Sequence, residues 1–269
     1  MSGPFTAVFL ANALAQSGFM DRYPLLYMIL ILILSMAVST TIAIMLERIA
    51  YRPIRYAPRL VPLITAIGAS FFLQYTFRGL YGSGFKAYPI PVVLQGYIML
   101  GSVRVYNTQI VAIFGALAMM IVLYTIVQRT KVGKAMRAVS EDKEVAALMG
   151  INVDRIIAMT FTMGGASAGA AGILYALLFP VVNFYMGFIP GLKAFTAAVL
   201  GGIGNVAGAF LGGSLLGLIE SVGPNLFFDG LGIPTPSQLK DGIAFAILVL
   251  ILIFRPTGIL GERIARTKA

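Results

Sequence analysis

The chain repeatedly runs for seventeen or more residues without one charged side chain. The clearest run covers 25–46, and others cover 60–77, 109–127 and 156–179. Because about 20 apolar residues in a helix cross the hydrocarbon core of a bilayer, these runs predict transmembrane helices. Hydrophobic residues make up 59% of the sequence and charged residues 11%, with a mean hydropathy of +0.91. That composition excludes an ordinary soluble domain and predicts an all-α polytopic membrane protein.

Two shorter apolar stretches, 4–20 and 242–254, lie near the ends of the sequence and are also predicted to cross. No basic segment precedes the first, so it is interpreted as a helix of the protein and not as a signal peptide. The whole of 1–269 is therefore expected to form a single transmembrane domain with about seven or eight crossings.

The apolar stretch 186–220 is too long for one crossing. It contains the run GGIGN at 201–205, where glycine favours a break. We therefore expect two short passes, 186–203 and 206–220, that meet at a glycine turn. Short or broken helices in a membrane usually line a cavity, because their freed backbone groups need water or protein partners.

The basic residues predict the orientation of these crossings. Loop 47–59 holds four Lys/Arg, 128–155 holds six and the tail 255–269 holds four, and all three are placed in the cytoplasm by their positive charge. The segments predicted outside hold five, which are Arg22, Arg78, Lys86, Arg104 and Lys240. The net charge of +10 is thus explained by orientation and not by nucleic-acid binding.

The longest charged, helix-forming interval is 129–155, which lies between two strongly apolar segments. Its apolar residues have broken helical spacing, which predicts an amphipathic helical element at the cytoplasmic surface. The small Ala146 and Ala147 would let the surface of another protein come close. We interpret the interval as a docking element, and the alternative is a solvated connector.

On the other side, residues 78–106 are rich in Gly, Tyr and Pro and are predicted to form an extracytoplasmic loop. The run YIMLGSVRVY places Gly101-Ser102 between β-branched and aromatic residues, which indicates a hairpin.

Several chemistries are excluded by what the sequence lacks. It has no cysteine and no histidine, so thiol chemistry and the usual zinc sites are absent, and few groups remain for general acid–base catalysis. There is no P-loop motif, because Gly133-Lys134 is followed by alanine. We expect a non-catalytic chain with no cofactor and no metal.

Polar residues inside the apolar segments are candidates for a translocation pathway. Lys193 and Glu220 lie near the ends of the two short passes, and snorkelling to the interface is favoured there over a pathway role. Gln74, Asn183 and Asn205 could equally join helices by hydrogen bonds. The candidate pathway residues are Gln74, Asn183, Lys193, Gly201, Gly202, Gly204, Asn205 and Glu220.

Five motifs distributed along nearly the whole chain resemble one family, the permease subunits of bacterial branched-chain amino-acid ABC importers. They are ERIAYRPIR (47–55), LITAIGASFFLQ (63–74), EDKEVAALMGINVDRIIAMTF (141–161), GLKAFTAAVLGGIGNVAGAFLGG (191–213) and RPTGILGE (255–262). Members of that family begin with a further membrane segment and an Asn-Phe-Ala-His-Gly-like turn before the part that matches 4–20. No residues of this sequence match them, so no pathway residue of that segment is carried over.

The resemblance implies roles and partners for this chain. In that family the loop matching 131–155 is the coupling element on which ATPase subunits dock, and Glu144, Ala146, Ala147 and Gly150 occupy its positions. The implied partners are two ATP-binding subunits, a second related permease subunit, and a periplasmic or extracellular substrate-binding protein. The implied location is the bacterial cytoplasmic membrane, as a multi-pass protein with a cytoplasmic C-terminus.

Our first hypothesis is therefore a permease subunit that carries branched-chain or related neutral amino acids. An alternative within the same family is a permease for urea or another small amide. A second class is an ion-coupled secondary transporter, which would need acidic residues inside the membrane, where Glu220 is the nearest candidate. A third is a membrane scaffold without transport.

Overall fold

A computed structural model of the chain describes residues 2–227, apart from 56, 59 and 102, together with 242, 246, 249, 250, 253 and 258–261. Lys240, most of the predicted crossing 242–254 and most of the predicted tail lie outside the described residues. The chain divides into two units, Met1–Gly187 and Phe188–Ala269, which are described separately.

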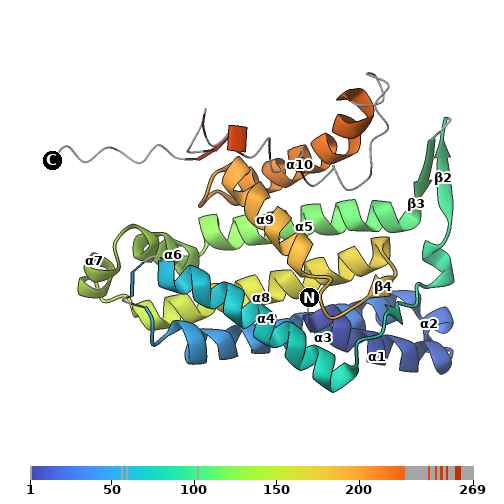
Figure 1. Cartoon of the computed structure of the whole chain (residues 1–269), viewed down its shortest axis with the longest axis horizontal. Coiled ribbons are helices and arrows are strands. Elements are labelled where there is room, and N and C mark those ends of the chain that lie inside the picture. Colours follow the sequence, from blue (N-terminus) through green and yellow to red (C-terminus); the bar gives the residue numbers. More distant parts are fainter. Residues whose placement is uncertain are drawn as a thin grey trace. The chain divides into compact units, whose positions relative to one another are not determined.

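The first unit is mainly helical (Figure 1). Its helices are α1 (Ser2–Gln16), α2 (Phe19–Arg22), α3 (Pro24–Leu46), the π-helical turn η1 (Glu47–Tyr51), α4 (Leu60–Tyr81), the 3-10 turn η2 (Val92–Leu94), α5 (Asn107–Arg129), α6 (Lys131–Glu141), α7 (Lys143–Leu148) and α8 (Val153–Leu178). Its strands are β1 (Lys86–Ala87), β2 (Tyr97–Leu100), β3 (Val103–Tyr106) and β4 (Val181–Val182).

Helices α3 and α8 pack along each other through small residues. A Cβ atom added at Gly169 would lie 2.6 Å from the carbonyl oxygen of Ser35, and one added at Gly165 would lie 2.8 Å from the Cα of Thr40. The Ser35 hydroxyl donates a hydrogen bond of 2.8 Å to the carbonyl of Gly169. In a membrane, where lipid is as apolar as leucine, such close backbone contact is what holds helices together.

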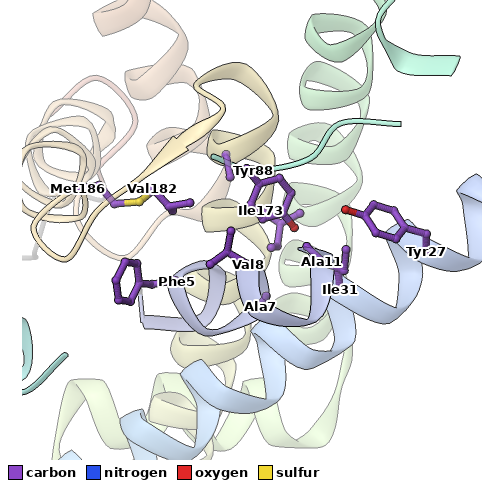
Figure 2. Close-up of a cluster of buried hydrophobic side chains, with 11 residues drawn as sticks. Phe5, Ala7, Val8, Ala11, Tyr27, Ile31, Tyr88, Ile173, Val182 and Met186 are labelled. Carbon is purple, nitrogen blue, oxygen red and sulfur yellow. The ribbon is translucent and has the colours of Figure 1, made fainter. Parts of the chain in front are cut away.

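The apolar core of this unit forms around α1 (Figure 2). Phe5, Val8 and Ala11 are buried on one face of α1 and meet Ile31 of α3 and Ile173 of α8. The three-residue spacing of Phe5, Val8 and Ala11 places them on one side of the helix. The short apolar stretch at the start of the sequence thus forms a helix that buries one face against α3 and α8.

The loop after α4 closes over one end of this core. The Tyr27 hydroxyl donates to the carbonyl of Pro89 at 3.0 Å, and the neighbouring Tyr88 is 3% exposed. Burial, with a smaller contribution from Tyr27, raises the pKa of the Tyr88 hydroxyl far above its ordinary value, so this group stays neutral. β1 pairs antiparallel with β4, which joins this loop to the segment after α8.

Strands β2 and β3 form an antiparallel hairpin, with Tyr97 opposite Tyr106. Gly101 has a φ of 63° at its turn, a conformation that favours glycine. In Figure 1 the hairpin lies at the opposite end of the first unit from α6 and α7, and α5 runs between these two ends.

The second unit contains α9 (Phe188–Gly201) and α10 (Val206–Phe227), which pack against each other. The predicted break between two passes is confirmed, since the helices are separated by residues 202–205. The helix of the second pass is longer than the predicted pass, because α10 continues beyond residue 220 to Phe227. A single charged residue does not interrupt the backbone hydrogen bonds of a helix, so Glu220 does not end α10.

Within the described residues, five helices are long and apolar enough to cross a membrane. They are Pro24–Tyr51, Leu60–Tyr81, Asn107–Arg129, Val153–Leu178 and Val206–Gly223, and Phe188–Gly201 is a shorter apolar helix. The all-α membrane fold predicted from the sequence is therefore confirmed. The count of seven or eight crossings stays a prediction.

Candidate functional site

The charged interval between α5 and α8 folds into two short helices, each begun by a side-chain cap. The Thr130 hydroxyl accepts a hydrogen bond from the backbone N–H of Gly133, and this cap begins α6. Oδ1 of Asp142 accepts from the N–H groups of Glu144 and Val145 and begins α7. These side chains satisfy backbone donors that a helix leaves free at its first turn.

Helix α7 presents apolar side chains outward. Val145 is 54% exposed, Leu148 is 87% exposed and Met149, directly after the helix, is 77% exposed. Ala147 and Glu144 are exposed as well. We call Val145, Leu148 and Met149 the α7 apolar patch; large apolar side chains that reach into solvent often mark a contact with another protein.

The expectation that Ala146 faces outward is wrong, since this residue is 3% exposed and lies against the protein itself. The sequence could not decide which face of so short a helix turns inward. Gly150 follows α7 with a φ of 81°, and its N–H and that of Ile151 donate to the carbonyls of Ala147 and Ala146. Gly150 is therefore the glycine that ends this helix.

Gln74 and Asn183 are the two candidate pathway residues in the first unit. They lie on different segments, and each makes a hydrogen bond to a residue close to it in sequence. The Gln74 amide donates to the hydroxyl of Ser70 at 3.1 Å, one turn earlier on α4. The Asn183 side chain accepts from the N–H of Tyr185 at 3.1 Å and closes a turn after β4. Their polar groups are thus accounted for by local structure.

In the second unit, Lys193 of α9 and Glu220 of α10 form an ion pair of 2.9 Å. Their side chains are 27% and 20% exposed, and the Oε1 atom of Glu220 is buried with no hydrogen-bond partner in the part of the chain that is described. Ionisable residues between membrane helices commonly pair in this way, because an unpaired charge is costly there. The ion pair brings together two of the candidate pathway residues, whose pairing was not predicted from the sequence.

The glycine turn between α9 and α10, residues 202–205, is a second place where candidate residues make contacts. Gly202 and Gly204 have φ values of 110° and 95°, and the Asn205 side chain accepts from the N–H of Gly208 at 3.0 Å. The amide of Asn205 also donates to the carbonyl of Leu260 at 3.1 Å. This last contact was not predicted, and it brings a segment 55 residues further along the chain onto the turn.

Residues 258–261 cap the end of α9. The N–H groups of Ile259 and Leu260 donate to the carbonyls of Leu200 and Gly201, both at 2.9 Å. The last carbonyls of a helix have no partner within the helix, so this segment satisfies them. In the sequence, the glycines of RPTGILGE are the feature that could have indicated this contact. Gly258 has a φ of 77° and lies against Gly202.

Segments predicted on the same side of the membrane meet within the first unit. Arg52 and Arg55 of the first basic loop bind Asp154 at the start of α8, and both parts are predicted inside. Lys86 and Ala87 pair with Val182 and Val181, and both parts are predicted outside. Which end faces the cytoplasm stays a prediction.

Orientation can be tested by cysteine labelling, since the chain has no native cysteine. Ile203 is 77% exposed in the glycine turn, and we expect Ile203→Cys to react with a membrane-impermeant maleimide only in inverted vesicles. The control, Tyr97→Cys in the hairpin, should react in intact cells. Labelling of Ile203→Cys from outside would place the turn on the opposite side.

Comparison with known proteins places these features in context. A family model described as the permease component of branched-chain amino acid transport systems matches residues 1–252. The chain is 41% identical over 267 residues to the high-affinity branched-chain amino acid transport system permease protein BraD of Pseudomonas aeruginosa, which covers 97% of this chain and 83% of BraD. It is 40% identical over 222 residues to LivH of Escherichia coli, a permease protein with the same description, which covers 81% of this chain and 69% of LivH.

A more distant relative is the galactose/methyl galactoside import permease protein MglC of Escherichia coli, 28% identical over 60% of this chain and 48% of MglC. No solved structure matches the chain. The match to the family model over 1–252, together with about 40% identity to BraD and LivH over most of their lengths, shows that this chain belongs to the family of branched-chain amino acid transport permease components.

Proposed function

We propose that this chain is the membrane-spanning permease subunit of an ABC importer that carries branched-chain or related neutral amino acids into a bacterial cell. The observation that supports this most is the 41% identity to BraD along 97% of the chain. The chain acts as a non-catalytic subunit, and its partners are two ATP-binding subunits, a second related permease subunit and a separate substrate-binding protein.

The proposed docking place for the ATP-binding subunits is the α7 apolar patch and the adjacent Ala147. These side chains are exposed on or directly after a short helix that is capped at both ends, so the backbone that carries the patch is fixed. A fixed apolar surface within a charged segment suits a protein contact, since little conformational freedom is lost on binding.

The substrate proposal also agrees with the charges inside the membrane helices. An aliphatic amino acid needs polar contacts for two charged groups and an apolar surface for the rest. Lys193 and Glu220 neutralise each other in the described part of the second unit. Glu220 is therefore not a lone acid of the kind that an ion-coupled secondary transporter uses for its coupling ion.

The test is uptake into proteoliposomes that hold the complete complex, with the binding protein supplied outside and ATP inside. We expect transport of labelled leucine, isoleucine or valine, and little transport of urea or ribose. Ribose is included because a more distant relative, MglC, is by its name a galactose/methyl galactoside import permease. Transport of ribose or urea in preference to all three amino acids would overturn the substrate assignment.

Two controls separate the alternatives. Replacing the P-loop lysine of the ATP-binding subunits should abolish uptake, whereas dissipating the sodium and proton gradients should not. Uptake that follows the ion gradients and ignores ATP would identify a secondary transporter.

A further inference from the structure

A cluster of charged residues links the end of α3 to the start of α8. Nη2 of Arg55 lies 2.5 Å from Oε1 of Glu47, and Nη1 of the same guanidinium binds Asp154. Arg52 binds the other oxygen of Asp154 at 3.2 Å. One arginine thus bridges two carboxylates that lie 107 residues apart in the sequence.

The inner half of this cluster is buried. The side chains of Glu47 and Arg55 are 4% and 10% exposed, whereas that of Asp154 is 55% exposed. A buried carboxylate needs a partner with fixed donors, and the planar guanidinium can hold one carboxylate on each of its two edges. Lysine, with a single ammonium, could not hold both in the same geometry.

The backbone at Glu47 is shaped around this contact. α3 passes into the π-helical turn η1, in which the N–H of Arg52 donates to the carbonyl of Glu47 at 2.8 Å, five residues back. Such turns are rare and occur often at functional sites. The rings of Tyr51 and Phe161, with centroids 5.2 Å apart, form a second contact between η1 and α8.

Asp154 is also close to the proposed ATPase-docking surface. It is the second residue of α8, and only Met149 to Asn152 separate α8 from α7. The Asn152 side chain caps α8 through the N–H of Arg155 at 3.0 Å, and Gly150 closes α7, so this connection is short and held at both ends. Asp154 is thus joined to α7 by only a short, capped connection.

On its other side, η1 has room to move. An apolar cavity of about 430 Å³ lies between the end of α3 and α4, lined by residues such as Met45, Ile49, Gly68 and Phe72. A shift of α3 and η1 towards α4 keeps the ion pairs with Asp154 only if α8 moves with them, because Asp154 belongs to α8. The cluster thus joins the end of α3 to the start of α8, while another face of α3 borders this cavity.

We propose that Arg55, held by Glu47 and bound to Asp154, is a positioning residue that transmits movement of ATPase-bound α7 to helix α3. This inference rests on the proposed function, in which α7 docks the ATP-binding subunits. The proposal names the residues through which docking on α7 acts on the membrane helices. It requires that loss of the ion pair between Arg55 and Asp154 changes coupling more than it changes folding.

The experiment compares Asp154→Asn with wild type in the reconstituted complex. Because Asp154 is largely exposed, the variant should fold and bind the ATP-binding subunits within about twofold of wild type. We expect ATP hydrolysed per leucine imported to rise about five- to tenfold, the lower end of a typical coupling between sites. Asp154→Glu, which keeps the carboxylate, should restore the ratio.

A matched control and two contrary results make the test decisive. Glu141→Gln removes an exposed carboxylate of the same segment that has no ion pair within the described structure, and it should leave the ratio unchanged. Asp154→Asn with hydrolysis and uptake reduced in proportion would overturn the proposal, and so would loss of ATPase binding. Failure of the proposed function would instead be seen in the wild-type complex, as no ATPase binding or leucine uptake.

Discussion

Replacing Gly201 with alanine is expected to remove most of the folded protein, because there is no space for one added carbon. The new Cβ would lie 1.9 Å from the carbonyl oxygen of Gly208 and 2.2 Å from its carbon. Both are backbone atoms of α10, so no side chain can rotate away, and α9 and α10 must separate. Gly212→Ala should behave alike, since its Cβ would lie 2.2 Å from the carbonyl oxygen of Ala197.

The expected loss is large on the scale of protein stability. Overpacking costs about 1–3 kcal/mol even where side chains can adjust, whereas here the backbone must move. We expect the apparent Tm of the detergent-purified protein to fall by roughly 5–10 °C. Fluorescence-detected size-exclusion and thermal unfolding would measure the yield and the Tm.

Gly217→Ala provides the matched control on the same helix. No described atom lies within 4 Å of a Cβ placed there, and alanine is a better helix former than glycine by about 1 kcal/mol. Its yield and Tm should therefore equal or exceed those of wild type. If Gly201→Ala matched this control, close contact of α9 and α10 through the glycine turn would not be needed for folding.

The break at these glycines shows which features a sequence can predict. Apolar runs predict the membrane helices, because in lipid every backbone group must be satisfied within a helix. The glycine-rich run 201–205 predicts the break between α9 and α10, and in the structure Gly202 and Gly204 adopt the positive φ values that favour glycine. These signals are local, so they can be read from neighbouring residues.

Features that depend on distant residues could not be predicted in this way. Nothing in the sequence near Arg55 indicates Asp154, 99 residues away, as its partner. Asn205 likewise gave no sign that its amide binds Leu260. Charge and hydrogen-bonding groups were visible at each position, but their pairing is decided by how the helices pack.

The direction of α7 is an intermediate case. Helical spacing predicted a short amphipathic element, yet both Ala146 and Ala147 remained candidates for its outward face. Burial of Ala146 decides the matter, because it turns Leu148 and Met149 outward with Ala147. The best positions for testing the docking surface are therefore the large residues Leu148 and Met149, and not the small Ala146.

Leu148→Glu is expected to abolish transport while the protein still folds and inserts. Leu148 is 87% exposed, so a polar side chain there costs the free protein almost nothing. At a protein interface the same charge would be buried without a partner. Loss of a central apolar contact typically costs 2 kcal/mol or more, which corresponds to about a thirtyfold weaker association.

The measurements are binding of the ATP-binding subunits, stimulation of their hydrolysis, and leucine uptake in proteoliposomes. Leu148→Met keeps an apolar side chain of similar volume and should retain all three. Ala147→Trp should act like Leu148→Glu if Ala147 fits closely against a partner. In contrast, Ala146→Trp should lower the yield of folded protein, since Ala146 is buried within the permease. Normal ATPase binding by Leu148→Glu would show that α7 is a solvated connector, and the docking surface would then have to be sought elsewhere on the charged segment.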